Sequence, residues 1–145
     1  MNNKILIIGG DPNSVNSEII YKTWNKLNFK VKKKIYLIAN FELIRKQFKK
    51  IKSKVKIIKV KSIKENSSTK FLKIIDIPLK FKNPFNVSLK TSSKYIIECF
   101  SLAHKISQNK ECKGLINCPI DKKLLNKSKK IGVTEFLASK CKINN

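Results

Sequence analysis

Three short segments of this chain combine glycine or proline with side chains that can bind an anion or move a proton. They are Gly9-Gly10-Asp11-Pro12, Asn117-Cys118-Pro119-Ile120-Asp121-Lys122 and Gly132-Val133-Thr134-Glu135. The carboxylate of Asp11, the ammonium of Lys122 and the hydroxyl of Thr134 could each orient a polar ligand. Backbone N–H groups at a turn or a helix start could bind its phosphate. We call these segments the first turn (residues 9–12), the second loop (residues 117–122) and the third loop (residues 132–135).

Each segment also has a purely structural interpretation. Gly, Asp and Pro are the usual residues of a tight turn. The second loop could be a strand exit followed by a solvated lysine, the normal state of lysine in proteins. In the third loop, Thr134 could cap a helix whose first turn carries Glu135.

The hydrophobic pattern predicts the elements that must position these segments. Short apolar runs predict strands at residues 5–8, 35–39, 55–60, 71–77 and 114–117. Helical spacing predicts helices capped by Ser17 and Asn40, a helix from Ser92 to Ile106, a short helix from Asp121 and a last helix capped by Thr134. Residues 62–91 are otherwise expected to be irregular, since Pro78 and Pro84 limit any long helix.

The alternation of strands and helices predicts an α/β fold with a mostly parallel sheet and right-handed crossovers. Such sheets bind ligands at the carboxyl ends of their strands. The three segments follow predicted strands or begin predicted helices, so we expect them at ligand-binding positions.

The charge of the chain raises a second hypothesis, a lysine-rich nucleic-acid binder. The sequence has 145 residues, of which 33 are Lys or Arg and 9 are Asp or Glu, for a net charge of +24. Arg45 is the sole arginine, although nucleic-acid readers favour arginine for bidentate contacts. Lys, Asn and Ile also share A/T-rich codons, so genome composition explains the basicity equally well. These observations argue against nucleic acid as a partner.

The remaining composition predicts a soluble cytoplasmic protein with a real core. Hydrophobic residues make up 41% of the chain, and no apolar run reaches the roughly 18 residues of a membrane span. The four cysteines form no CxxC pair, and the single histidine, His104, stands at no metal-ligand spacing from them. We therefore expect reduced thiols and a structural His104, with no metal ligands in this chain.

Together and in this order, the three segments resemble motifs of 4-hydroxythreonine-4-phosphate dehydrogenases. That family has a G-D-P-A-G-I-G-P-E turn after its first strand, where residues 10–18 here read Gly-Asp-Pro-Asn-Ser-Val-Asn-Ser-Glu. Its T-G-P-I-N-K loop is matched by the second loop, Asn-Cys-Pro-Ile-Asp-Lys. Its G-H-T-E-F-L-A motif is matched at residues 132–138 by Gly-Val-Thr-Glu-Phe-Leu-Ala.

The resemblance implies an isopropylmalate-dehydrogenase-like fold of two α/β domains that works as a homodimer. Family members use NAD(P) and a divalent metal (Zn, Mg or Co) to oxidise and decarboxylate 4-phosphooxy-threonine in pyridoxal phosphate (vitamin B6) biosynthesis. It also implies that Thr134 binds this phosphorylated substrate. Residues 1–117 would form the first α/β domain, and residues 118–145 would begin the second.

The departures from the motifs predict a weakened site. Val133 replaces the substrate-binding histidine of the family and cannot form a hydrogen bond through its side chain. Asn13, Ser14 and Asn16 of the first motif, and Cys118 of the second loop, stand where the family has smaller residues, chiefly glycine, and could crowd a ligand.

The metal-binding histidines and most cofactor contacts of the family would fall beyond Asn145. We therefore expect a truncated family chain that is inactive alone and associates with itself or with a missing C-terminal half. The alternative is a noncatalytic remnant or binding module of the same family.

Overall fold

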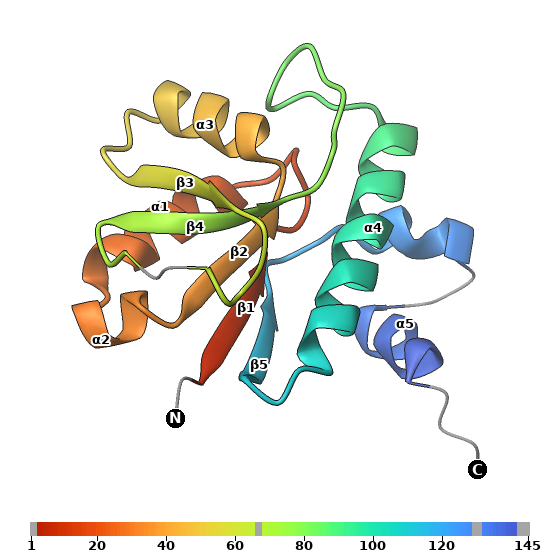
Figure 1. The fold of residues 1–145 in the computed structure, drawn as a ribbon. Helices are drawn as coiled ribbons and strands as arrows, with labels where there is room; N and C mark the ends of the chain where they lie inside the picture. Colours follow the sequence, from red (N-terminus) through yellow and green to blue (C-terminus); the bar gives the residue numbers. More distant parts are fainter. Residues whose placement is uncertain (1–2, 66–67, 129–131, 142–145) are drawn as a thin grey trace.

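The centre of the molecule is a five-stranded sheet in which every strand pair is parallel. The computed structural model describes residues 3–65, 68–128 and 132–141. The strands are β1 (Lys4–Ile8), β2 (Ile35–Ala39), β3 (Lys56–Val60), β4 (Phe71–Asp76) and β5 (Cys112–Asn117), arranged in the order β3-β4-β2-β1-β5 (Figure 1). The prediction of an α/β fold with a mostly parallel sheet is confirmed.

Helices cover both faces of this sheet. They are α1 (Asn16–Lys26), α2 (Phe29–Lys32), α3 (Phe41–Lys50), α4 (Leu89–Ser107), the 3-10 helix η1 (Lys122–Ser128) and α5 (Val133–Lys140). On one face α1 and α3 contribute Trp24 and Phe48 to a core that includes Leu37 of β2. On the other face α4 packs Phe100 against Leu6 and Phe136, with η1 and α5 outside it (Figure 1). The central strand β2 is thus buried along its whole length, as its continuous apolar sequence requires, whereas the edge strands β3 and β5 are largely exposed.

The order of the strands creates a switch point beside β1. From β1 the chain crosses to β2 on one side, whereas after α4 it returns to pair β5 with β1 on the other side. In open α/β sheets the connecting loops diverge at such a point and leave a crevice at the carboxyl ends of the strands. The first turn and the second loop are the two segments that leave the sheet there.

Two of the predicted helix starts are correct. The Asn40 side chain accepts a hydrogen bond of 2.8 Å from Leu43 N and so caps α3. Asp121 begins a helix as predicted, although the helix is of the 3-10 type, and its carboxylate accepts from Lys123 N at 3.0 Å.

The other three predicted starts are wrong. Ser17 lies inside α1, because Val15 occupies the cap position, and α4 begins at Leu89 with Ser88 as its cap. Likewise Thr134 lies in the first turn of α5, whose cap residue is Gly132. In each case the helix starts earlier than the hydrophobic spacing indicates: α1 and α4 each include polar residues before their first buried apolar residue, and α5 already includes Val133.

The boundary predicted at residues 117 and 118 stays a prediction. In the described residues η1 and α5 pack against α4 in the same hydrophobic cluster as the sheet. None of the helices described is both long enough and apolar enough to cross a membrane.

Candidate functional site

The first turn and the second loop meet at the carboxyl ends of β1 and β5. Ile8 pairs with Asn117 in the register of the two strands, and Cys118 N donates a hydrogen bond of 3.0 Å to Ile8 O. Gly10 then adopts a φ of 76°, which L side chains rarely tolerate. A Cβ at this position would also lie 2.9 Å from Pro119 O. Glycine is therefore required here both by its backbone angle and by the closeness of the second loop.

Asn16, at the start of α1, joins the two loops directly. Its side-chain Nδ2 donates a hydrogen bond of 2.6 Å to Pro119 O, across 103 positions of sequence. The residue is 2% exposed. Its Oδ1 and the hydroxyl of Ser17 are buried with no hydrogen-bond partner among the described residues. Asn16 thus fills the space between the first turn and the second loop; that it crowds a ligand stays a prediction.

Two further amides hold the first turn against the loop that precedes α4. The Asn13 side chain donates to Val87 O and accepts from Val87 N, both at 2.7 Å. Gln47 of α3 is 3% exposed and its Nε2 donates to Pro12 O at 2.8 Å and to Pro84 O at 2.7 Å. These contacts fix the turn from the α4 side and the α3 side. The sequence does not predict this role of Gln47, because one polar residue on an amphipathic helix carries no signal of its distant partners.

The predicted polar residues of this edge have modest roles. Asp11 is half-buried, and its Oδ1 accepts from Asn13 N at 2.8 Å, which stabilises the turn itself. Lys122, the last residue of the second loop, is exposed at the first position of η1. Both side chains therefore lie at the edge that the sequence predicts.

Cys118 does not crowd the crevice, contrary to expectation. It is 8% exposed and packs in the core between the sheet and α1, beside Trp24 and Leu37. Burial raises the pKa of its thiol to about 11, so it is protonated at neutral pH. Backbone direction at the end of β5 turns this side chain inward, which sequence spacing alone does not reveal.

The third loop lies apart from the other two. Phe136 packs edge-on against Phe100 with ring centres 5.9 Å apart, and Cys141 Sγ lies 3.5 Å from His104 Nε2. These contacts place α5 along the C-terminal half of α4 (Figure 1). No hydrogen bond or ion pair of the described residues joins α5 to the first turn or to the second loop. The structure thus brings together two of the three predicted segments.

The start of α5 presents Thr134 and Glu135 to solvent, while Val133 is half-buried against the core. Within the described residues no side chain caps the helix. A Cβ on Gly132 would lie 2.9 Å from Glu135 Oε2, so this carboxylate folds back over the helix start. A negative charge at that place stabilises the helix dipole and would compete with an anionic ligand.

The described residues do not fit a divalent metal. Among them no three His, Cys, Asp or Glu side chains come together as a metal site requires. The contact between His104 and Cys141 supplies two donors at most. The described part of the chain therefore lacks the set of ligands that such an ion needs.

The all-parallel sheet, with helices on both faces and a switch point beside β1, defines an open α/β protein. Comparison with known proteins makes this specific: the model of the pyridoxal phosphate biosynthetic protein PdxA family matches residues 30–145. The chain belongs to this family. No curated protein matches it in sequence.

Solved structures share the fold at low sequence identity. A 4-hydroxythreonine-4-phosphate dehydrogenase from Burkholderia phymatum is 18% identical, with a TM-score of 0.86 over 100% of this chain and 45% of its own. An enzyme of the same name from Klebsiella pneumoniae is 19% identical, with a TM-score of 0.81 over 96% of this chain and 44% of its own. The chain therefore spans less than half the length of these proteins. The first turn lies outside the residues that the family model matches. It lies within the match to the Burkholderia structure, which covers all of this chain.

Proposed function

We propose that this chain supplies the substrate-side part of a 4-hydroxythreonine-4-phosphate dehydrogenase in pyridoxine biosynthesis and does not turn over alone. Family membership supports the pathway, and the names of the structural neighbours support the reaction class. The observation that carries the proposal is the exposed start of α5, where Thr134 keeps the threonine of the family motif.

Thr134 can contact a phosphorylated substrate through its hydroxyl, which both donates and accepts. It lies in the first helical turn, where backbone N–H groups and the helix dipole favour an anion. Glu135 must then move away from Gly132, or the substrate must bind beside it. Binding by this chain alone is accordingly expected to be weak.

The proposed reaction also requires NAD(P) and a divalent metal. Residues other than those described would have to bind both. With NAD(P) as hydride acceptor and the metal as Lewis acid, the family reaction oxidises an alcohol and then loses carbon dioxide. The described residues of this chain hold the substrate side and the scaffold. The proposed site of action is the cytoplasm.

A partner polypeptide could supply those residues by adding to the open edge of the sheet at β5. Within the described residues β5 pairs with β1 alone, and Ile116 on it is 55% exposed. Beside it lies an apolar groove of about 170 Å³ lined by Ile19 and Trp24 of α1 and by Ile116. An unpaired strand edge next to such a groove favours pairing with a second copy or with a complementary half.

Calorimetric titration with 4-phosphooxy-threonine tests the proposal. The wild-type chain should bind weakly, Thr134→Ala should weaken binding further, and Thr134→Ser should retain it because the hydroxyl remains. Addition of NAD with Zn, Mg or Co should give no NADH. Equal affinity of Thr134→Ala and wild type would show that α5 is not the substrate site, and NADH formation would show that the chain is a complete enzyme.

A noncatalytic binding module of the same family is the second candidate, and Val133 favours it. That hypothesis predicts the same weak binding, but no activity when the chain is mixed with the unmatched part of the Burkholderia enzyme. The dehydrogenase proposal predicts that activity appears in the mixture.

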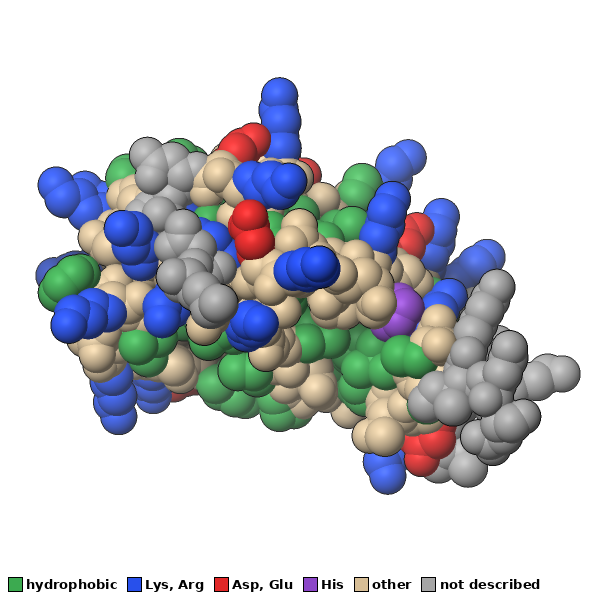
Figure 2. Space-filling view, turned by 60° about the horizontal axis from the view of Figure 1, so that its bottom comes forward, with side chains coloured by type: hydrophobic (Ala, Val, Ile, Leu, Met, Phe, Trp, Pro, Cys, Tyr) green, Lys and Arg blue, Asp and Glu red, His purple; other side chains and the backbone are tan. Residues whose placement is uncertain are grey.

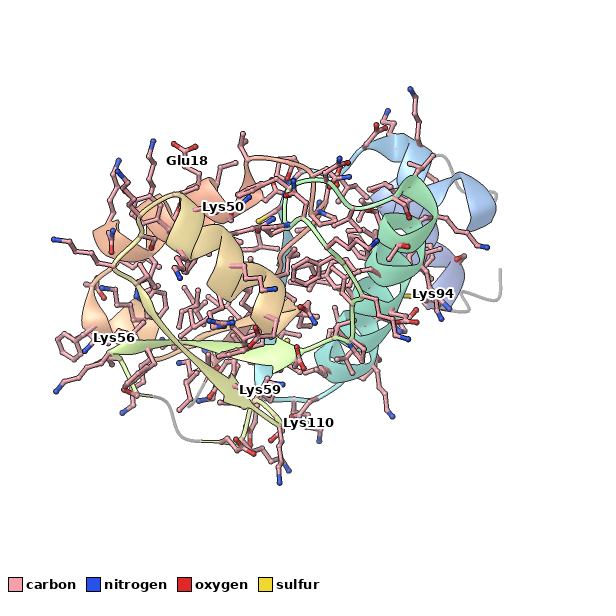
Figure 3. All side chains as sticks on the ribbon, turned by 90° about the horizontal axis from the view of Figure 1, so that it is seen from above. Glu18, Lys50, Lys56, Lys59, Lys94 and Lys110 are labelled. Carbon is pink, nitrogen blue, oxygen red and sulfur yellow. The ribbon has the colours of Figure 1, made fainter. Side chains whose placement is uncertain are left out.

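The structure gives little support to nucleic-acid binding. Figure 2 shows lysines scattered over the visible face with hydrophobic side chains between them. Lys50, Lys56, Lys94 and Lys110 come from different elements and lie far apart in Figure 3. One groove of about 980 Å³ carries Lys80, Lys90 and Lys94, but Leu79, Ile97 and Glu98 also line it. Positive charge interrupted in this way by apolar and acidic side chains is not a built site for a strand.

A further inference from the structure

The crevice beside β1 is filled by side chains of the chain itself. The Asn16 amide lies between Gly10 and Pro119, where the matching family motif has glycine. Asn13 is bonded to both backbone groups of Val87, and Gln47 to Pro12 O and Pro84 O. The first turn is therefore held from three directions, by β5, by the loop before α4 and by α3.

Little space remains beneath the turn. The cavity bounded by Gly10, Asn16, Ser17 and Gln47 has a volume of about 10 Å³. That is the size of one water molecule, and a phosphate group is several times larger. The unpartnered Asn16 Oδ1 and Ser17 Oγ border this cavity, and both can accept a hydrogen bond from a water.

Dinucleotide phosphates bind a first turn only where glycines let the backbone approach them and helix N–H groups point at them. Here Gly10 is packed against Asn16 and the second loop, so its missing side chain opens no space to solvent. Asn16 uses its N–H donor on Pro119 O, within the protein. The residues present thus do not fit the phosphates of NAD(P) at this turn.

We infer that Asn16 is a lock: it ties the first turn to the second loop and closes the switch-point crevice to nucleotide phosphates, leaving room for one buried water. The crevice is a structural joint in this chain. A cofactor used by the proposed enzyme would have to bind elsewhere, so this inference stands or falls independently of substrate binding at Thr134.

The lock can be tested through Cys118, which precedes Pro119 and is 8% exposed. Iodoacetamide alkylation of Cys118, followed by mass spectrometry of its peptide, measures how often the joint opens. Asn16→Asp keeps the shape but removes the donor to Pro119 O, and Asn16→Ala removes the side chain. Either should speed alkylation about tenfold, the effect of losing one buried hydrogen bond on a local opening equilibrium.

Asn28→Ala is the matched control, because Asn28 caps α2 by accepting from Val31 N at 3.0 Å and touches neither loop. It should leave the Cys118 rate unchanged. If Asn16→Ala fails to fold, the isosteric Asn16→Asp still gives the answer. An unchanged Cys118 rate in folded Asn16→Asp would overturn the lock.

Fluorescence titration with NADH tests the closure. The wild-type chain should show no saturable binding that depends on Asn16, even at millimolar NADH, the upper end of usual Michaelis constants. Binding of equal affinity in wild type and Asn16→Asp would lie elsewhere and agree with a closed crevice. Saturable binding to the wild-type chain that Asn16→Asp weakens would overturn the inference.

Discussion

The ammonium of Lys73 lies 4.6 Å from the centre of the Tyr36 ring, inside the protein. Lys73 is 0% exposed, and its Nζ donates hydrogen bonds of 3.0 Å to the carbonyl oxygens of Lys32 and Lys33. In the described part of the chain no carboxylate pairs with it. Burial, together with the nearby charge of Lys4, lowers its pKa from 10.5 to about 8. The folded protein thus keeps a charge that the interior disfavours.

Stability should therefore rise between pH 8 and pH 10.5, the window set by the pKa of Lys73. Below pH 8 both states carry the proton and the cost of burying the charge is constant. Above it the folded state releases the proton first, so the unfolded state binds more protons and unfolding becomes less favourable. The shift corresponds to a gain of about 3 kcal/mol across the window.

Urea unfolding at several pH values measures this gain. Lys73→Met should flatten the rise, while the same change at Lys56, which is exposed on β3, should keep it. Parallel pH profiles for wild type and Lys73→Met would contradict the assignment.

Tyr95→Phe should destabilise the fold through a hydrogen bond to the backbone. Asn40 N donates to the Tyr95 hydroxyl at 2.8 Å, and Tyr95 is 2% exposed. Phenylalanine would leave this buried N–H without an acceptor, at a cost of about 1–3 kcal/mol. Chemical unfolding should show that loss. Tyr21→Phe is the control, because among the described residues Tyr21 is half-exposed and its hydroxyl has no hydrogen-bond partner. Equal losses for the two variants would exclude the hydrogen bond as the cause.

The local sequence was sufficient to predict the positions of the strands and one helix cap. The five apolar runs match β1 to β5 within two residues. For β2 the reason is that a strand buried on both faces must be apolar throughout. The Asn40 cap was predictable because its partner, Leu43, is three residues away. Both features depend on neighbours in the chain.

Features that depend on distant residues were not predictable in the same way. Asn16 bonds to a carbonyl 103 positions away, and the position of α5 along α4 follows from Phe136 meeting Phe100. Burial of Lys73 runs against the usual exposure of lysine and arises from carbonyl groups at the end of α2. The motifs predicted three candidate segments, whereas the tertiary contacts decide which of them meet.

Val133→His should strengthen substrate binding if Thr134 marks the substrate site. The imidazole restores the group that the family motif carries and could hydrogen-bond a phosphate, worth about 1.5–3 kcal/mol. Val133 is half-buried, so the variant also loses some packing against the core. Calorimetric titration of 4-phosphooxy-threonine against Val133→His and a Val133→Phe control checks this. Equal affinity of all three proteins would mean that no working site remains at α5.

Self-association should increase with salt and depend on the β5 edge. The net charge of +24 opposes association at low ionic strength, but screening limits its reach to about 8 Å at physiological salt. Ile116→Lys should keep the protein monomeric in sedimentation experiments. Ile58→Lys is the matched control, since Ile58 is 41% exposed on β3, the other edge strand. A compact wild-type monomer at both low and high salt would refute the role of this edge.

The pairing of β5 with β1 also determines the order in which the strands of the sheet can pair during folding. β1 can pair with β2 once residues up to 39 have been synthesised. Its other neighbour, β5, begins at Cys112, so Ile8 can pair with Asn117 only much later. Closing a loop of that length is slow compared with forming the local β1-α1-β2 unit. During synthesis, one side of β1 is therefore open while most of the chain is made. The hydrogen bond from Asn16 to Pro119 O forms at the end of this process, when β5 has paired with β1.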